Sequence, residues 1–212
     1  MCCEVSLGWY IELLGQPQIR HPLPEIDPGV EEVLFVSEYY VVQAITLHER
    51  VIQFAVVSRR KSFRPRFVFW DGFQDQLVVL QRSSFGDLPE GELFVSFGAR
   101  RFTCFESVFL GNPGFHQTRV WGWHEMSGGD GLSDLAVEYS RASEAEQLAM
   151  RPELRRTTRV SLYGETSPHQ EVIHGPPWIG GDSDSMRVWR EVSPRIDLWR
   201  MRWIRLRTRS PR

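Results

Sequence analysis

A run of β-branched and aromatic residues between positions 31 and 60 is the feature that most constrains how this chain can fold. The segments 33–47 and 51–58 are dense in Val, Ile, Phe and Tyr, and the polar tripeptide His-Glu-Arg follows the first of them. Such residues fit the pleated, half-buried surface of a sheet, and a short polar break between two segments of this kind suits a hairpin loop. The run therefore predicts two antiparallel strands.

A second hairpin is expected within the stretch RRFTCFESVFLGNPGFHQTRVWGWHE, residues 100–125. Aromatic residues occupy both alternating sets of positions before its turn, which favours a central strand. The tetrapeptide Asn-Pro-Gly-Phe at 112–115 places proline and glycine at the two central positions of a type II turn, where the glycine adopts a positive φ. A hairpin closed at this turn brings Glu106 roughly opposite Val120.

Two helices are expected outside these hairpins. The segment 5–15 has apolar residues at spacings of three and four, and glycine and proline mark its end. The segment 134–150 is rich in Ala, Glu, Gln and Leu, begins with Ser133 or Asp134 as a candidate cap, and should be closed by Pro152.

These elements predict an α+β fold, mostly an antiparallel β-sheet with a short N-terminal helix and one mid-chain helix. A chain of 212 residues is long enough for one sizeable core, and we expect a single domain over residues 5–180. Pro65 indicates an edge strand, because proline cannot donate to a ladder. Further strands are expected at 63–70, 76–81 and 157–164.

Charge is spread unevenly along the chain. Residues 186–212 form a basic tail, in which nine arginines against two acidic residues give a net charge of +7. Because the whole chain carries −2, residues 1–185 carry −9. Arginine and tryptophan alternate in this tail, which suits an anionic membrane surface, nucleic acid or the acidic body of the chain itself. The candidate binding residues there are Trp199, Arg200, Arg202 and Trp203.

The sequence also excludes several classes of protein. Three cysteines without a CxxC pair do not make a disulfide framework or a zinc motif, and we expect no metal and no cofactor. No apolar run is long enough to cross a bilayer, and the first residues lack the pattern of a secretory signal. The sequence therefore predicts a cytoplasmic protein, with peripheral contact to the inner membrane kept open.

Several short segments together resemble a bacterial domain family that has no established activity and is often fused to an N-terminal membrane helix. The resemblance covers roughly residues 10–165. It implies a fold and an association with the membrane, but no catalytic residues. Relatives of this kind would carry the membrane helix and a helical stalk before the first segment. The matching segments are LGQP, EYYVVQAIT, VVSRRKSFRPRF, FGARR, FLGNPGFHQT and RTTRVSLYG.

An enzyme would have to use the polar residues of the second hairpin. The candidates for a hydrolase or nuclease are His116 or His124 with Glu106 or Glu125. The two histidines are eight residues apart, which is about 25 Å along a strand, so they cannot share a metal ion or a proton. We therefore assign no catalytic residue and favour a protein that is not an enzyme.

A basic stretch at residues 59–66 is interleaved with phenylalanine and is a candidate binding surface. Such a stretch can track a nucleic-acid strand, although the acidic body would repel a polyanion. Its candidate residues are Arg59, Arg60, Arg64 and Arg66. The main hypothesis is a sensing or protein-interaction module near the inner face of a bacterial membrane, which binds a protein or an anionic membrane surface. A hydrolase and a nucleic-acid-binding protein are the alternatives.

Overall fold

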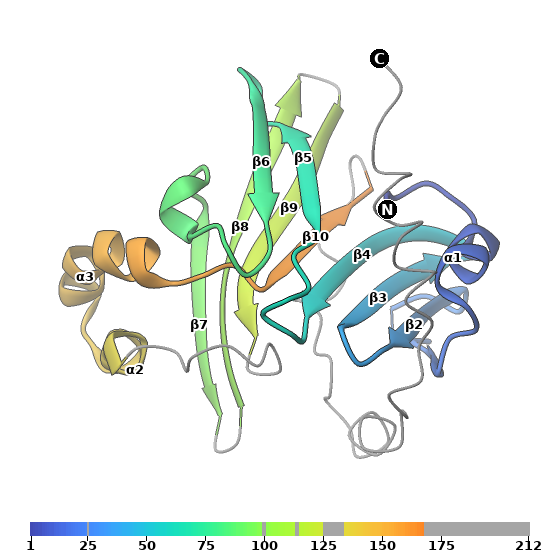
Figure 1. The fold of residues 1–212 in the computed structure, drawn as a ribbon, viewed down its shortest axis with the longest axis horizontal. Coiled ribbons are helices and arrows are strands. Elements are labelled where there is room, and N and C mark those ends of the chain that lie inside the picture. Colours follow the sequence, from blue (N-terminus) through green and yellow to red (C-terminus); the bar gives the residue numbers. More distant parts are fainter. Residues whose placement is uncertain (25, 99–100, 113–114, 125–133, 168–212) are drawn as a thin grey trace.

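An α+β fold built on an antiparallel sheet is confirmed in the computed structural model, which describes residues 1–24, 26–98, 101–112, 115–124 and 134–167 (Figure 1). Eight strands form one sheet in the order β1-β2-β3-β4-β10-β9-β8-β7, and β5 and β6 form a separate two-stranded hairpin. The main-sheet strands are β1 (Ile19–Pro22), β2 (Val30–Val36), β3 (Tyr40–Leu47), β4 (Arg50–Ser58), β7 (Glu92–Gly98), β8 (Arg101–Asn112), β9 (Phe115–His124) and β10 (Leu162–Thr166).

The run at 31–60 forms three strands where the sequence predicted two. Ser37 divides the expected first strand, because its hydroxyl accepts hydrogen bonds from the backbone N–H groups of Tyr39 and Tyr40, at 3.1 and 3.0 Å. Its own N–H donates to the Tyr40 carbonyl at 2.8 Å, which closes a tight turn between β2 and β3. A serine that satisfies local amides in this way favours a turn over a continuous strand.

The second hairpin forms as expected, from β8 and β9, and Asn112 pairs with Phe115 at its closed end. The predicted type II turn lies outside the described residues. Glu106 pairs with Trp121, one residue beyond the expected Val120. A one-residue change of register moves a side chain to the other face of the sheet. The observed register therefore places Trp121, and not Val120, on the same face as Glu106.

The hairpin of β5 (Arg66–Trp70) and β6 (Asp75–Val79) stands in front of the sheet (Figure 1). Its inward-facing rings pack on the sheet: Phe67 lies 4.4 Å from Tyr163 and Phe69 lies 5.9 Å from Trp121, centroid to centroid. Strand β5 begins directly after Pro65, in the expected segment.

The N-terminal helix is α1 (Leu7–Leu14), and the mid-chain helical region forms two helices, α2 (Asp134–Arg141) and α3 (Glu144–Thr157). The expectation that Pro152 ends the helix is wrong, because Pro152 lies inside α3. Ser143 is the N-cap of α3, and the Glu146 carboxylate accepts hydrogen bonds from the serine backbone N–H and hydroxyl at 2.8 and 2.7 Å. No helix of the described residues is long and apolar enough to cross a membrane.

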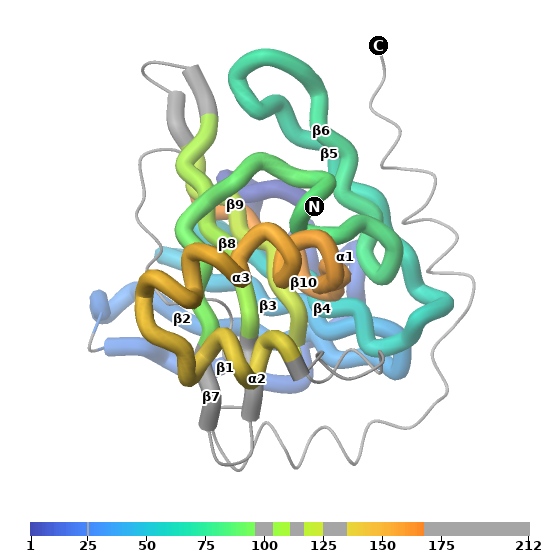
Figure 2. The backbone as a smooth tube through the Cα atoms, turned by 90° about the vertical axis from the view of Figure 1, so that its left-hand side faces the viewer, coloured from blue at the N-terminus to red at the C-terminus, as the bar shows by residue number. Residues whose placement is uncertain are grey.

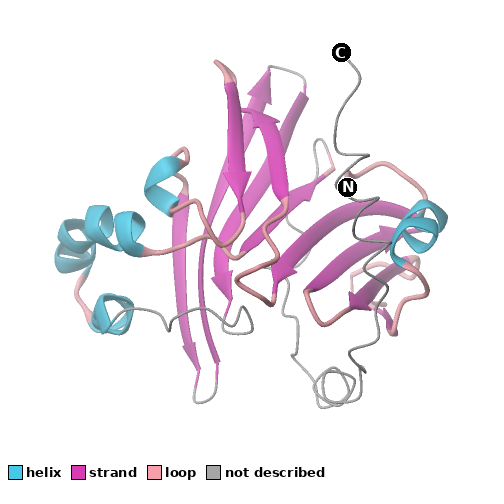
Figure 3. Ribbon diagram, viewed as in Figure 1, coloured by secondary structure: helices cyan, strands magenta, loops and turns pink. Residues whose placement is uncertain are grey.

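One face of the sheet carries the main core and is called the covered face here. Helix α1 packs there through Leu7 and Tyr10, and the short 3₁₀ helix η1 (Phe85–Asp87) contributes Phe85. Helices α2 and α3 lie together beside β7, at the end of the sheet away from α1 (Figures 2 and 3). The other side of the sheet, the opposite face, carries a separate apolar cluster. Its members are Leu34, Val36, Val41, Val57, Val120 and Leu162.

Candidate functional site

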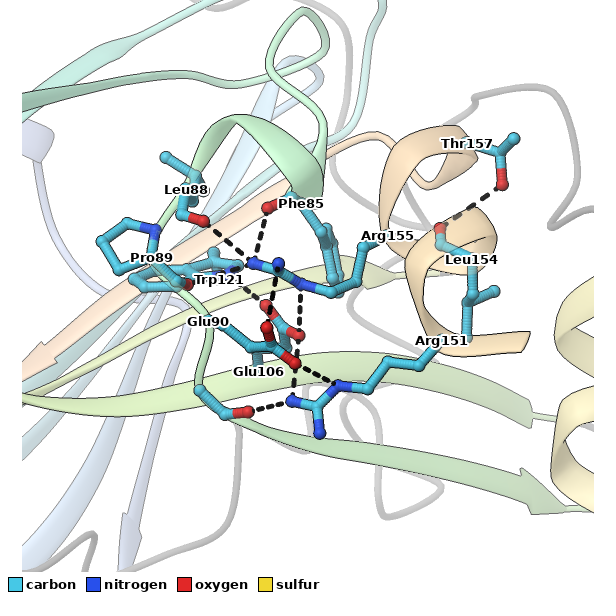
Figure 4. Close-up of polar contacts among 11 residues, drawn as sticks. Phe85, Leu88, Pro89, Glu90, Glu106, Trp121, Arg151, Leu154, Arg155 and Thr157 are labelled. Carbon is cyan, nitrogen blue, oxygen red and sulfur yellow. Dashed lines mark hydrogen bonds and ion pairs between the residues drawn. The ribbon is translucent and has the colours of Figure 1, made fainter. Parts of the chain in front are cut away.

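Glu106, one of the two candidate carboxylates of a possible enzyme, is fully buried on the covered face. Its Oε2 atom accepts a hydrogen bond from the Trp121 indole N–H at 3.1 Å. Its Oε1 atom accepts one from the Arg155 guanidinium at 2.8 Å (Figure 4). Both carboxylate oxygens are therefore engaged by groups of the chain itself.

Arg155 connects three parts of the fold. Besides Glu106, its Nη2 atom donates to the backbone carbonyls of Phe85, Leu88 and Pro89, at 2.9, 2.9 and 3.2 Å (Figure 4). These carbonyls belong to η1 and the segment after it, whereas Glu106 belongs to the sheet. The single guanidinium thus joins α3, this segment and β8.

Arg151, one turn earlier on α3, completes the cluster. Its Nε atom lies 3.0 Å from a Glu90 carboxylate oxygen, and its Nη2 atom lies 3.7 Å from Glu106. It also donates to the Gly91 carbonyl. Two arginines therefore face two carboxylates, and the charges of the cluster balance.

The pKa of the Glu106 carboxyl is raised above its ordinary value, chiefly because burial disfavours the charged form. The Trp121 indole and the Arg155 guanidinium oppose this shift. A raised carboxyl pKa suits a general acid only where a substrate can reach it. A cavity of about 390 Å³ lies beside the cluster, but Glu106 does not line it. Its lining residues are Gly86, Glu90, Leu148, Arg151, Pro152, Arg155 and Arg156. The arrangement thus acts as a buried structural ion pair.

The structure does not bring the candidate catalytic residues together. His116 pairs with Gly111 near the closed end of the β8–β9 hairpin, and His124 pairs with Thr103 at the other end. Because successive residues of a strand alternate between faces, Glu106 and His124 lie on opposite faces of the sheet. Glu125 lies outside the described residues.

The candidate basic residues at 59–66 are largely used within the chain. Arg59 donates to the Ser37 carbonyl at 2.6 Å, and desolvation, with the neighbouring Arg60, lowers the pKa of its guanidinium. Arg60 pairs with Glu38 at 2.8 Å. Arg64 donates to a backbone carbonyl at 2.9 Å, and Arg66 is exposed at the start of β5. The tail candidates Trp199, Arg200, Arg202 and Trp203 lie outside the described residues.

Sequence reasoning missed an apolar surface on the outward side of the β5–β6 hairpin. Val68 pairs with Leu77 across the two strands, and these side chains are 64% and 50% exposed. Trp70 is 39% exposed, and Phe73 at the tip is 95% exposed. The sequence does indicate this surface, because apolar residues occupy both alternating sets of positions in 67–70. A strand that is apolar on both sides but belongs to a two-stranded hairpin must expose one side.

The chain matches no family model, no curated protein and no solved structure. The resemblance to a bacterial domain family stays a prediction. Within the ranges that the structure describes, no three His, Cys, Asp or Glu side chains gather as a metal site would require.

Proposed function

We propose that this chain is a non-enzymatic protein-interaction module and that its partner docks on the outward side of the β5–β6 hairpin. The observation that carries the proposal is the concentration of exposed apolar side chains there. Of the eight large hydrophobic residues exposed in the described part of the chain, four lie on this one hairpin: Val68, Trp70, Phe73 and Leu77. Apolar residues clustered on a surface mark interaction sites, whereas scattered ones are ordinary.

Hydrogen bonds of the Asp71 side chain stabilise the hairpin tip. Asp71 accepts hydrogen bonds from the backbone N–H groups of Phe73 and Gln74, both at 2.8 Å, and from the Gln76 amide at 2.6 Å. These bonds fix the loop that presents Phe73, and the inward rings anchor the ribbon to the core. An aromatic side chain on a preorganised loop loses little conformational entropy on binding, which suits an interaction hot spot.

The absence of a catalytic arrangement among the described residues supports the non-enzymatic part of the proposal. An enzyme needs a nucleophile or acid-base pair whose groups converge on a reachable pocket. Glu106 is instead held in a buried ion pair, and His124 lies on the other face of the sheet. Neither group is placed to act on a substrate with the other.

The proposal is tested by photo-crosslinking in the cells that produce the protein. A photoreactive amino acid replaces Phe73 in the full chain, and a matched variant carries it at Leu148, which is 71% exposed on α3. We expect a discrete protein adduct at position 73 but not at 148, and loss of the adduct when Val68→Ser and Trp70→Ser are added. Equal adducts at both positions, or an adduct that survives the serine substitutions, would contradict the proposal.

An anionic membrane surface is a second candidate partner, favoured by exposed Lys61, Arg64 and Arg66 near the base of the same hairpin. Asp71 and Asp75 flank the aromatic tip and would be repelled by anionic lipid, which makes a protein the better candidate. Co-sedimentation with phosphatidylglycerol vesicles separates the two partners. If the wild type binds these vesicles and Phe73→Ser abolishes the binding, the partner is the membrane and not a protein.

A further inference from the structure

The apolar cluster on the opposite face of the sheet is built, among the described residues, from strand residues alone. All its members belong to strands, and the partly buried residues packed against it, Ile19 and Phe105, belong to β1 and β8. None of the described helices and neither strand of the β5–β6 hairpin contributes a residue to it. The cluster members are nevertheless only 0–6% exposed. Neighbouring strands shield side chains from the side, but they do not cover the ends that point away from the sheet.

A buried side-chain oxygen, Gln43 Oε1, lies on the same face as this cluster and lacks a hydrogen-bond donor among the described residues. Gln43 lies between Leu34 and Ala55 in the register of the opposite face, and it is 1% exposed. Its amide nitrogen donates to Glu32, but its Oε1 atom has no hydrogen-bond partner among the described residues. A buried acceptor without a donor is costly, which indicates that an N–H group belongs there.

The chain leaves the sheet beside this region. Thr166, the last residue of β10, lies in register with Gln53, which pairs with Ile45, which in turn pairs with Glu32. Three strand spacings separate Thr166 from Glu32, a distance of about 14 Å that a few extended residues can cross. Residues 168–212 therefore begin within reach of Gln43.

The chemistry of residues 168–212 complements the opposite face. The segment contains Val, Ile and Trp for the apolar cluster, and nine arginines in its basic tail, residues 186–212. Arginine and tryptophan are N–H donors, which the Gln43 acceptor requires, and arginine also suits the neighbouring Glu32 carboxylate. The net charges of +7 for the tail and −9 for residues 1–185 attract each other.

We infer that residues 168–212 dock on the opposite face of the sheet as an intramolecular cover, with an N–H donor of this segment bound to Gln43 Oε1. The inference goes beyond the docking surface on the β5–β6 hairpin and does not depend on it. It places the arginines and tryptophans of the tail against the chain's own acidic body. A membrane or a nucleic acid would then have to displace the tail from the sheet before binding it.

Intramolecular photo-crosslinking in the full chain tests this inference. A photoreactive residue replaces Glu32, and a control chain carries it at Glu12, which is exposed on α1. After irradiation of the purified protein at low concentration, mass spectrometry maps the crosslinked peptides. We expect crosslinks from position 32 to peptides of residues 168–212 within the same chain, several-fold above those from position 12.

Replacement of Ile19 by the same photoreactive residue provides a second position, in case the change at Glu32 disturbs the fold. Ile19 lies at the rim of the same cluster. If neither folded variant crosslinks to residues 168–212 above the control, or if the crosslinks join two copies of the chain, the inference is wrong. Crosslinking at position 73 in cells has no bearing on this result, so the two proposals fail separately.

Discussion

Glu106 lies directly across the β8–β9 hairpin from Trp121, and this pairing places the carboxylate and the indole on the same face of the sheet. Arg155 approaches the same carboxylate from α3. The two side chains that bind this carboxylate, Trp121 and Arg155, thus lie 15 and 49 positions away from Glu106 in the chain. The role of the buried ion pair in the fold is to hold α3 and the segment after η1 on the sheet.

Removal of this carboxylate should destabilise the protein strongly. Glu106→Ala removes the buried carboxylate that the Arg155 guanidinium contacts at 2.8 Å, and breaking a buried ion pair in this way typically costs about 3–5 kcal/mol. We expect a loss of this size in the free energy of unfolding from urea denaturation. Glu153→Gln is the matched control, because it breaks only the exposed pair with Arg156. This change should have no measurable effect on the free energy of unfolding. Similar midpoints for the two variants would show that the buried pair does not hold α3 in place.

Stability should fall in alkaline solution through the buried thiols. Burial raises the pKa of the Cys104 thiol, so the folded protein keeps a proton that the unfolded chain releases above about pH 8.5. The unfolded state then binds fewer protons, and stability is lost as the pH rises, by about 1.4 kcal/mol per pH unit for each such group. Cys3 is buried in the same way.

Cys104→Ala should remove one of these contributions. Between about pH 9.5 and 10.5, the slope of unfolding free energy against pH should become shallower by about 1.4 kcal/mol per unit. Cys2→Ala serves as the control, since Cys2 is exposed. Parallel curves for Cys104→Ala and the wild type would contradict the predicted role of the Cys104 thiol.

A side chain at Gly164 should strain the centre of the sheet. Strand β10 runs between β4 and β9, and a Cβ atom at Gly164 would lie 2.8 Å from the Phe54 carbonyl oxygen and 3.2 Å from the Ala55 Cβ. Gly164→Ala should therefore lower thermal stability, by about 1–3 kcal/mol in free energy. Gly8→Ala in α1 meets only ordinary contacts and should stabilise by about 0.5–1 kcal/mol. The opposite order of melting temperatures would contradict this packing.

Local patterns in the sequence predicted much of the fold. Helix α1 follows from apolar spacing and from Gly15, which adopts a φ of 91° at its end. The β8–β9 hairpin follows from alternation and from its turn residues. Such features depend on neighbours in the chain, so the sequence carries them directly.

The errors arose where a few local hydrogen bonds or a distant contact decide the structure. Ser37 ends a strand within a continuous apolar run, and the Ser143–Glu146 capping box begins a helix that accommodates Pro152. The pairing of Glu106 with Arg155 depends on tertiary packing, which no periodicity reports. The β5–β6 hairpin differs, because apolar residues at both alternating sets of positions in 67–70 were visible in the sequence. Only the place of this strand in a two-stranded sheet determines that one side is exposed.

The central claim, that the outward side of the β5–β6 hairpin binds a protein, is tested most directly by affinity. With the partner captured at position 73, titration calorimetry would compare the wild type with Phe73→Ser and with Leu148→Ser on α3. We predict that Phe73→Ser weakens binding by about 30-fold, or about 2 kcal/mol, as expected for a central aromatic anchor, with an unchanged melting temperature. Leu148→Ser should bind as tightly as the wild type. An unchanged dissociation constant for folded Phe73→Ser would contradict the claim.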